Sequence, residues 1–166
     1  MRKFFLLIVV LVFSSTIVLA QKNGKTRFSV GAELGLTTGT SALTNSLGIG
    51  ASVQAEHFFQ EDLSGTVLFG VVSYIGRSAS STQNYKAYSV TPLRAGVRYY
   101  IGDGFHIGAQ IGVGFATGGT AFAYSPQIGY NFKTSKGKSI DTDFKYDGYS
   151  NSGTFSALGI RVGYIF

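Results

Sequence analysis

The last ten residues of the chain alternate between two kinds of side chain. Apolar residues occupy every second position, and most positions between them hold a small residue or Arg161. Side chains of a β-strand point to opposite faces in turn, so this strand has one continuous apolar face and one largely small or polar face. A barrel wall with lipid outside and a narrow lumen inside requires this pattern. The apolar positions are Leu158, Ile160, Val162, Tyr164 and Phe166.

Similar alternation recurs in eight segments between residues 26 and 166, separated by turn signals. No segment has the three-to-four spacing of an amphipathic helix. Segments of about ten residues with a period of two suit tilted transmembrane strands, and eight is the smallest usual number of strands in such barrels. We therefore predict an all-β fold: an eight-stranded antiparallel transmembrane up-and-down β-barrel over residues 26–166.

Two segments are irregular. In the third, near residues 63–75, the alternation does not settle the register because both faces carry apolar residues. Leu68 and Val72 fall on the face opposite Val67 and Phe69. The sixth contains Pro126, which cannot donate a ladder hydrogen bond, so we expect a bulge or a local irregularity there.

The N-terminus has the features of a cleaved secretory signal. Two basic residues precede an apolar run from Phe4 to Phe13. Residues 18–20, which are small or acceptable at a signal-peptide cleavage site, precede Gln21. We predict a signal peptide over residues 1–20 and a short periplasmic tail over residues 21–25. An uncleaved anchor helix is the alternative, since the apolar stretch approaches the roughly 17 residues that span a bilayer. The absence of cysteine excludes disulfides and thiolate metal sites.

Connection lengths orient the predicted barrel. The turns 60–62 and 102–104 are short, whereas the connections 37–46 and 76–87 are longer and rich in Ser, Thr and Asn. Short turns of such barrels face the periplasm, so both termini should be periplasmic. The basic turn 133–139 is longer than the other two. Aromatic residues at the strand ends on the predicted periplasmic side should form an interfacial girdle: Phe58, Phe59, Tyr99, Tyr100, Phe105, Tyr130 and Phe132.

A soluble barrel or sandwich, with its apolar face turned inward, is the main alternative fold. Charged residues are 13% of the chain, against about 25% in ordinary soluble domains. The polar face consists mostly of Gly, Ser and Gln with isolated charges, which suits a narrow lumen better than a surface in water.

Opposite charges nearly balance on the predicted inward face. Burying either sign alone is costly, so we predict paired networks and expect Arg161 to pair with an acidic residue of the seventh strand. Such networks could form a rigid plug or a polar path for ions or small solutes. The predicted interior network comprises Arg27, Glu33, Glu56, Arg94, Arg98, Asp141, Asp143, Lys145, Asp147 and Arg161.

Signals for catalysis or metal binding are weak. Only His106 of the two histidines falls on the inward face, which gives poor support to a Ser-His-carboxylate site. Two isolated histidines do not make a metal site. The run 143–148 is rejected as a calcium loop because Lys145 occupies a ligand position and Thr154 stands where the closing Glu should be. We expect no catalytic residue, no cofactor and no metal.

The whole predicted domain resembles the small bacterial outer-membrane β-barrel family that includes the OmpA transmembrane domain, OmpX and OmpW-like proteins. The segments Thr91–Tyr100 and Tyr124–Phe132 resemble recurrent strands of that family, and the C-terminal strand resembles the signal that the barrel-assembly machinery reads. The resemblance implies an integral protein of the bacterial outer membrane, surrounded by phospholipid and lipopolysaccharide.

The resemblance does not imply any catalysed reaction. We expect a non-enzymatic structural, surface-interaction or adhesion role through the outer loops, with an extracellular ligand that the sequence does not identify. A narrow channel for ions or small solutes is the alternative, and a lipid-modifying enzyme is a distant one. The formal charge of +6 falls to +4 without Arg2 and Lys3. Basic residues near the predicted periplasmic end suit anionic headgroups, and we expect no nucleic-acid partner.

Overall fold

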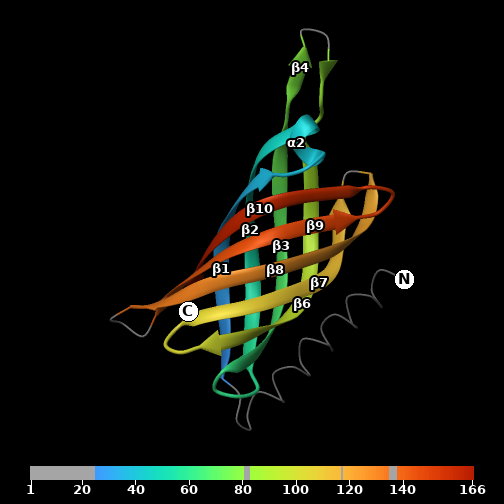
Figure 1. Ribbon diagram of the computed structural model, residues 1–166. Coiled ribbons are helices and arrows are strands. Elements are labelled where there is room, and N and C mark those ends of the chain that lie inside the picture. Colours follow the sequence, from blue (N-terminus) through green and yellow to red (C-terminus); the bar gives the residue numbers. More distant parts are fainter. Residues whose placement is uncertain (1–24, 81–82, 117, 135–137) are drawn as a thin grey trace, which may run out of the picture.

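The computed structural model describes residues 25–80, 83–116, 118–134 and 138–166. Eight antiparallel strands close into a barrel in the order β1-β10-β9-β8-β7-β6-β3-β2, as Figure 1 shows. Chain neighbours pair throughout, and β1 closes the barrel against β10. The predicted all-β, eight-stranded antiparallel barrel is confirmed. The predicted signal peptide and residues 21–24 of the predicted tail lie outside the described residues. The barrel strands are β1 (Thr26–Thr37), β2 (Asn45–Phe58), β3 (Leu63–Gly76), β6 (Tyr88–Ile101), β7 (Phe105–Ala116), β8 (Gly119–Lys133), β9 (Ser139–Ser150) and β10 (Thr154–Ile165).

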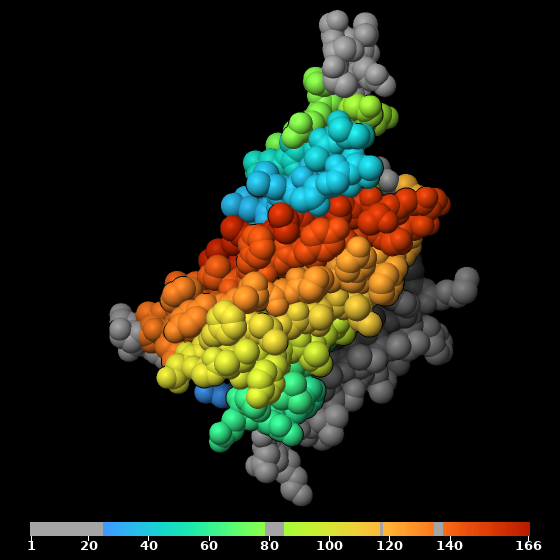
Figure 2. Space-filling view, viewed as in Figure 1, coloured from blue at the N-terminus to red at the C-terminus, as the bar shows by residue number. Residues whose placement is uncertain are grey.

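The apolar face of the wall points outward. In β1, for example, Val30 and Leu34 are 52% and 53% exposed, whereas Glu33 between them is 2% exposed. The same alternation continues around the barrel, and Figure 2 shows the strands forming a continuous surface on one side. Soluble monomers rarely expose such large contiguous apolar areas. The soluble alternative is therefore wrong for this fold, and the wall has the character of a lipid-facing surface.

The structure fixes the register of the third segment. Leu68 and Val72 point into the barrel, and Val67, Phe69 and Val71 point outward. The pairing of Phe69 with Leu93 continues this register into β6. Periodicity alone was ambiguous here because both faces of β3 are apolar in the C-terminal half of the strand.

The local irregularity expected at Pro126 is present as a gap in pairing, without a shift of register. Pro126 pairs with Ala109 of β7, and the register of β8 against β9 is the same before and after it. Between residues 122 and 133 of β8, the ladder with β9 omits pairs only at positions 125 and 126, so the missing N–H is accommodated by a short gap in pairing. The side chain of Pro126 faces outward.

The two longer connections contain local structure that the alternation did not predict. Connection 37–46 includes the single-turn helix α2 (Ser41–Thr44), and connection 76–87 includes a small ribbon of β4 (Ser78–Ser80) and β5 (Gln83–Asn84). Both lie at one end of the barrel, at the top of Figure 1. We call this the loop end. The opposite end, which carries the tight turns after β2 and β6, is the turn end.

The N-terminal end of β1 and the C-terminal end of β10 both lie at the turn end, because Ser29 pairs with Ile165. Within the described residues, no helix has the length and apolar character that crossing a bilayer requires.

Candidate functional site

The lumen is occupied by ion pairs, and Arg98 is at the centre of a group that lies just inside the mouth at the turn end. Its Nη1 lies 2.7 Å from Asp141 Oδ2 and its Nη2 lies 2.7 Å from Asp143 Oδ2. All three side chains are at most 1% exposed. The arginine extends from β6 and both carboxylates extend from β9, so this contact crosses the lumen between strands that are not neighbours. It therefore braces the barrel from within.

Two further groups complete this cluster. His106 Nε2 lies 2.9 Å from Asp143 Oδ1, and Arg161 Nη1 lies 3.7 and 3.9 Å from the nearer oxygens of the two aspartates. The structure thus places Arg161 beside the acidic residues of the seventh barrel strand. Its shortest hydrogen bonds go elsewhere, to the hydroxyls of Ser52 at 2.9 Å and Ser29 at 2.8 Å.

Glycines provide the space for this large side chain. A Cβ added at Gly31 or Gly163 would lie 2.9 or 2.5 Å from the guanidinium of Arg161. The small inward residues of β1 and β10 are therefore required where a long cation crosses a narrow lumen.

A second cluster lies closer to the loop end. Arg94 Nη1 pairs with Asp147 Oδ1 at 2.5 Å, and Lys145 bridges Glu33 and Asp147 at 2.5 and 3.0 Å. The Ser125 hydroxyl donates a hydrogen bond to Asp147 Oδ1 at 2.8 Å. Burying any of these charges without a partner would cost much free energy of desolvation. Each of them has a counterion here.

The mouth at the turn end is closed by a third group. Arg27 Nη2 lies 2.9 Å from Glu56 Oε2, and the Tyr100 hydroxyl donates to Glu56 Oε1 at 2.8 Å while accepting from Arg27 at 2.8 Å. Ser64 donates a further hydrogen bond to Glu56 at 2.7 Å. The Arg27 guanidinium lies 4.4 Å from the centre of the Phe58 ring, a favourable cation–π distance.

This geometry corrects two members of the predicted girdle. Phe58 and Tyr100 belong to the charged mouth of the lumen, because each shares the inward phase of its strand with Glu56 and Arg98 respectively. Phe59, Tyr99, Tyr130 and Phe132 are exposed on the outside near the turn end, and Phe105 is half-buried on the outward phase of β7.

The ten residues of the predicted network all point into the lumen, where five cations meet five anions. Nine of them are at most 4% exposed, and the Arg27 side chain at the mouth is 22% exposed. The formal charges of these ten residues sum to zero. A neutral, mutually paired set is the arrangement that a low-dielectric interior favours.

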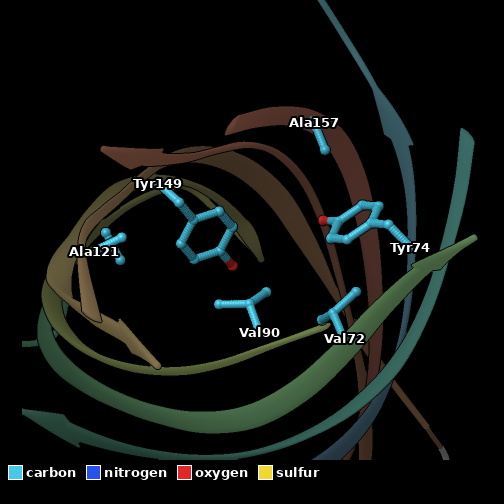
Figure 3. Packing of buried hydrophobic residues seen from close by; sticks show 7 residues of the cluster. Val72, Tyr74, Val90, Ala121, Tyr149 and Ala157 are labelled. Carbon is cyan, nitrogen blue, oxygen red and sulfur yellow. The ribbon is translucent and has the colours of Figure 1, made fainter. Parts of the chain in front are cut away.

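An aromatic and aliphatic cluster fills the lumen at the loop end. Tyr74 and Tyr149 project inward from opposite sides with Val72 and Val90 beside them, as Figure 3 shows. Both tyrosines are at most 2% exposed. Phe155 packs on this cluster, with its ring centre 4.8 Å from that of Tyr74. The charged lumen is thus covered by tightly packed rings at this end.

The sequence reasoning missed Tyr74 and Tyr149, and a sequence signal was available only for Tyr149, which shares the inward phase of Asp147 two residues earlier. The phase of β3 around Tyr74 is ambiguous in the sequence because both faces are apolar there. In the structure, glycines make room for both rings: a Cβ at Gly48 would overlap the Tyr74 ring, and one at Gly114 would lie within 2.7 Å of Tyr149.

The cluster around His106 offers three potential metal ligands. His106, Asp141 and Asp143 each present an atom within 4.8 Å of the others. However, Arg98 already bonds both carboxylates and supplies the opposing charge. The geometry is that of an internal ion-pair network. Among the described residues, no serine hydroxyl hydrogen-bonds His106, whose other short contact is to the Gly104 carbonyl. The described residues therefore do not assemble a Ser-His-carboxylate arrangement here.

Comparison with known proteins identifies the class of fold. No protein-family model and no curated sequence matches the chain. Among solved structures, Neisserial surface protein A is similar, with a TM-score of 0.60, 14% identity, and coverage of 86% of this chain and 98% of that one. Ail, the attachment invasion locus protein of Yersinia pestis, has a TM-score of 0.59 at 14% identity, covering 87% of this chain and 100% of its own. The structure of Ail in complex with the heparin analogue sucrose octasulfate has a TM-score of 0.58 at 13% identity, covering 87% of this chain and 100% of its own.

These similarities establish a shared architecture at low sequence identity. The chain has the fold of the small eight-stranded bacterial outer-membrane β-barrels. The apolar outer wall and the polar lumen of this chain agree with that class.

Proposed function

We propose that this protein is a closed, non-enzymatic barrel of the bacterial outer membrane whose working surface is the loop end. The observation that carries the proposal is the filled lumen: two groups of buried ion pairs, a partly buried pair at the turn-end mouth and an aromatic cluster occupy it from one mouth to the other. An eight-stranded barrel has an interior only wide enough for its own side chains. A solute path would need these pairs and rings to separate, so the channel alternative has less support.

The proposed orientation places the loop end outside the cell and both termini in the periplasm. Barrels of this class have short periplasmic turns and longer extracellular loops, and both α2 and the β4–β5 ribbon lie at the loop end. Partners are then outer-membrane phospholipid and lipopolysaccharide at the wall, with ligands approaching the loops.

The C-terminal strand supports the proposed route of insertion. Leu158, Ile160, Val162 and Tyr164 are 40–47% exposed on the outer wall, and Phe166 is 69% exposed. An exposed apolar row ending in an aromatic residue suits recognition by the barrel-assembly machinery.

The chemistry of Ail does not transfer directly. Ail was crystallised with a sulfated heparin analogue, whereas the connections at the loop end of this chain contain only two charged residues, Arg77 and Lys86. Few cations are thus present to hold a polyanion, so the proposed surface interaction involves ligands of lower charge.

Sidedness can be tested in intact cells because the chain contains no cysteine. Ser78→Cys at the loop end and Asp103→Cys in a turn are both at exposed positions. A membrane-impermeant maleimide should label Ser78→Cys in intact cells and Asp103→Cys only after permeabilisation. The reverse pattern would refute the orientation. A liposome-swelling assay with small sugars tests closure, and swelling above that of protein-free vesicles would contradict it.

A further inference from the structure

A hollow of about 320 Å³ lies at the loop end, between α2 and the turn that joins β9 to β10. Tyr88, Tyr149 and Phe155 line it together with hydroxyl-bearing residues and Asn151. In Figure 2, α2 and the adjoining β10 border each other at this end of the molecule. The volume is at the lower end of the range, about 300–1,000 Å³, that small-molecule sites occupy.

Rigid aromatic rings form part of the lining of the hollow. Tyr88 and Phe155 stack with ring centres 4.1 Å apart and planes 22° apart, and Tyr74 supports Phe155 from the lumen side at 4.8 Å. Tyr88 and Phe155 nevertheless remain partly exposed, unlike the deeply buried Tyr74. Apolar ring surface is thus held in a fixed position and remains accessible from the loop end.

Polar groups without charge, from α2 and from the turn between β9 and β10, form another part of the lining. Ser41 is anchored by a hydrogen bond from the Ser156 backbone N–H at 3.0 Å, and Asn151 donates to the Thr120 carbonyl at 3.0 Å. Thr40 and Thr154 are exposed, and within the described chain their hydroxyls form no hydrogen bond. The described residues that line the hollow include no charged side chain.

We propose that this hollow binds a neutral saccharide unit of a glycan presented from outside the cell. A sugar ring has an apolar C–H face that can pack on the aromatic rings, and hydroxyls that can bond to Thr40 and Thr154. A lipid chain would leave those hydroxyls without partners, which is unfavourable once water is displaced. A polyanion would meet no cation among the lining residues. This inference rests on the proposed function, because it requires the loop end to face outward.

The test uses the folded barrel in nanodiscs without lipopolysaccharide and an array of neutral and sulfated glycans, followed by saturation-transfer NMR with lactose, maltose and diacetylchitobiose. We expect binding of at least one neutral glycan, weakened at least about tenfold by Tyr88→Leu. Tyr85→Leu is the matched control, because Tyr85 is an exposed tyrosine of the same end that does not line the hollow. Thr154→Val, which removes one exposed hydroxyl, provides a milder second variant if Tyr88→Leu does not fold.

Several outcomes would overturn the inference. These are no binding of any neutral glycan, binding of sulfated glycans alone, or equal binding by Tyr88→Leu and the control. Recognition restricted to added lipopolysaccharide would overturn the assignment to an external glycan. Failure here is distinguishable from failure of the proposed function: a closed, correctly oriented barrel that binds no glycan refutes only this inference, whereas a conducting barrel refutes the proposed function.

Discussion

Removal of Arg98 should be among the most damaging single changes in the lumen. Its guanidinium bonds Asp141 and Asp143 at 2.7 Å each, and all three groups are shielded from water. Arg98→Met would leave two buried carboxylates facing only His106 and the more distant Arg161. Breaking a buried pair by removing one partner costs about 3–5 kcal/mol. We expect a loss of about 4 kcal/mol in the free energy of unfolding, a large fraction of the roughly 5–15 kcal/mol typical of folded proteins.

A charge-balanced double variant separates lost charge pairing from lost packing. Arg98→Met with Asp141→Asn restores equal numbers of cations and anions in the predicted network, and Asp143 keeps its contact with His106. This variant should recover at least about 2 kcal/mol of the loss, because replacing both partners of a pair is far milder than removing one. Arg77→Met, at an exposed loop position, is the control and should change stability by less than about 0.5 kcal/mol.

The assay is equilibrium urea unfolding in lipid vesicles. The chain has no tryptophan, so circular dichroism and the heat-dependent gel mobility of the folded barrel serve as signals. A loss below about 1 kcal/mol in Arg98→Met would refute the view that these ion pairs brace the barrel. A double variant less stable than the single one would refute the charge-balance argument.

Three further predictions address packing, the turn-end mouth and assembly. Gly48→Ala should destabilise the barrel by about 1–3 kcal/mol, since the added Cβ would overlap the Tyr74 ring. Gly153→Ala, with open space around it, should be nearly neutral in the same urea titration. Tyr100→Phe should cost about 1–3 kcal/mol by leaving Glu56 short of a buried donor, whereas the same change at exposed Tyr99 should cost little; equal effects would return Tyr100 to the outer girdle. Deletion of Phe166 should reduce the amount of folded barrel in outer-membrane fractions while refolding in vitro persists, and unchanged cellular levels would contradict its role as an assembly signal.

Much of the wall could be predicted from the sequence because a strand has only two faces. Once the alternation assigned Arg94 and Arg98 to one phase, the inward direction of these residues followed. The partners could not be predicted in the same way. Arg98 of β6 meets aspartates of β9 because closure and stagger bring non-neighbouring strands across a narrow lumen, and local periodicity contains no information about that distance.

The errors at the turn end arose from using position along the barrel without the phase of the strand. Tyr100 and Phe58 lie at strand ends, as girdle residues do, but their phase is that of Arg98 and Glu56. At the loop end the difficulty was different, because β3 is apolar on both faces near Tyr74. There the hydrophobic pattern does not distinguish a lipid-facing ring from one packed in the lumen.

The most direct measurement of the central claim is single-channel conductance of the folded barrel in a planar lipid bilayer, with folding verified by heat-dependent mobility. The wild-type barrel should give no conductance, because paired charges and packed rings fill the lumen. Reproducible conductance steps from the folded barrel, absent after heat unfolding, would contradict the closed lumen and make transport the leading function.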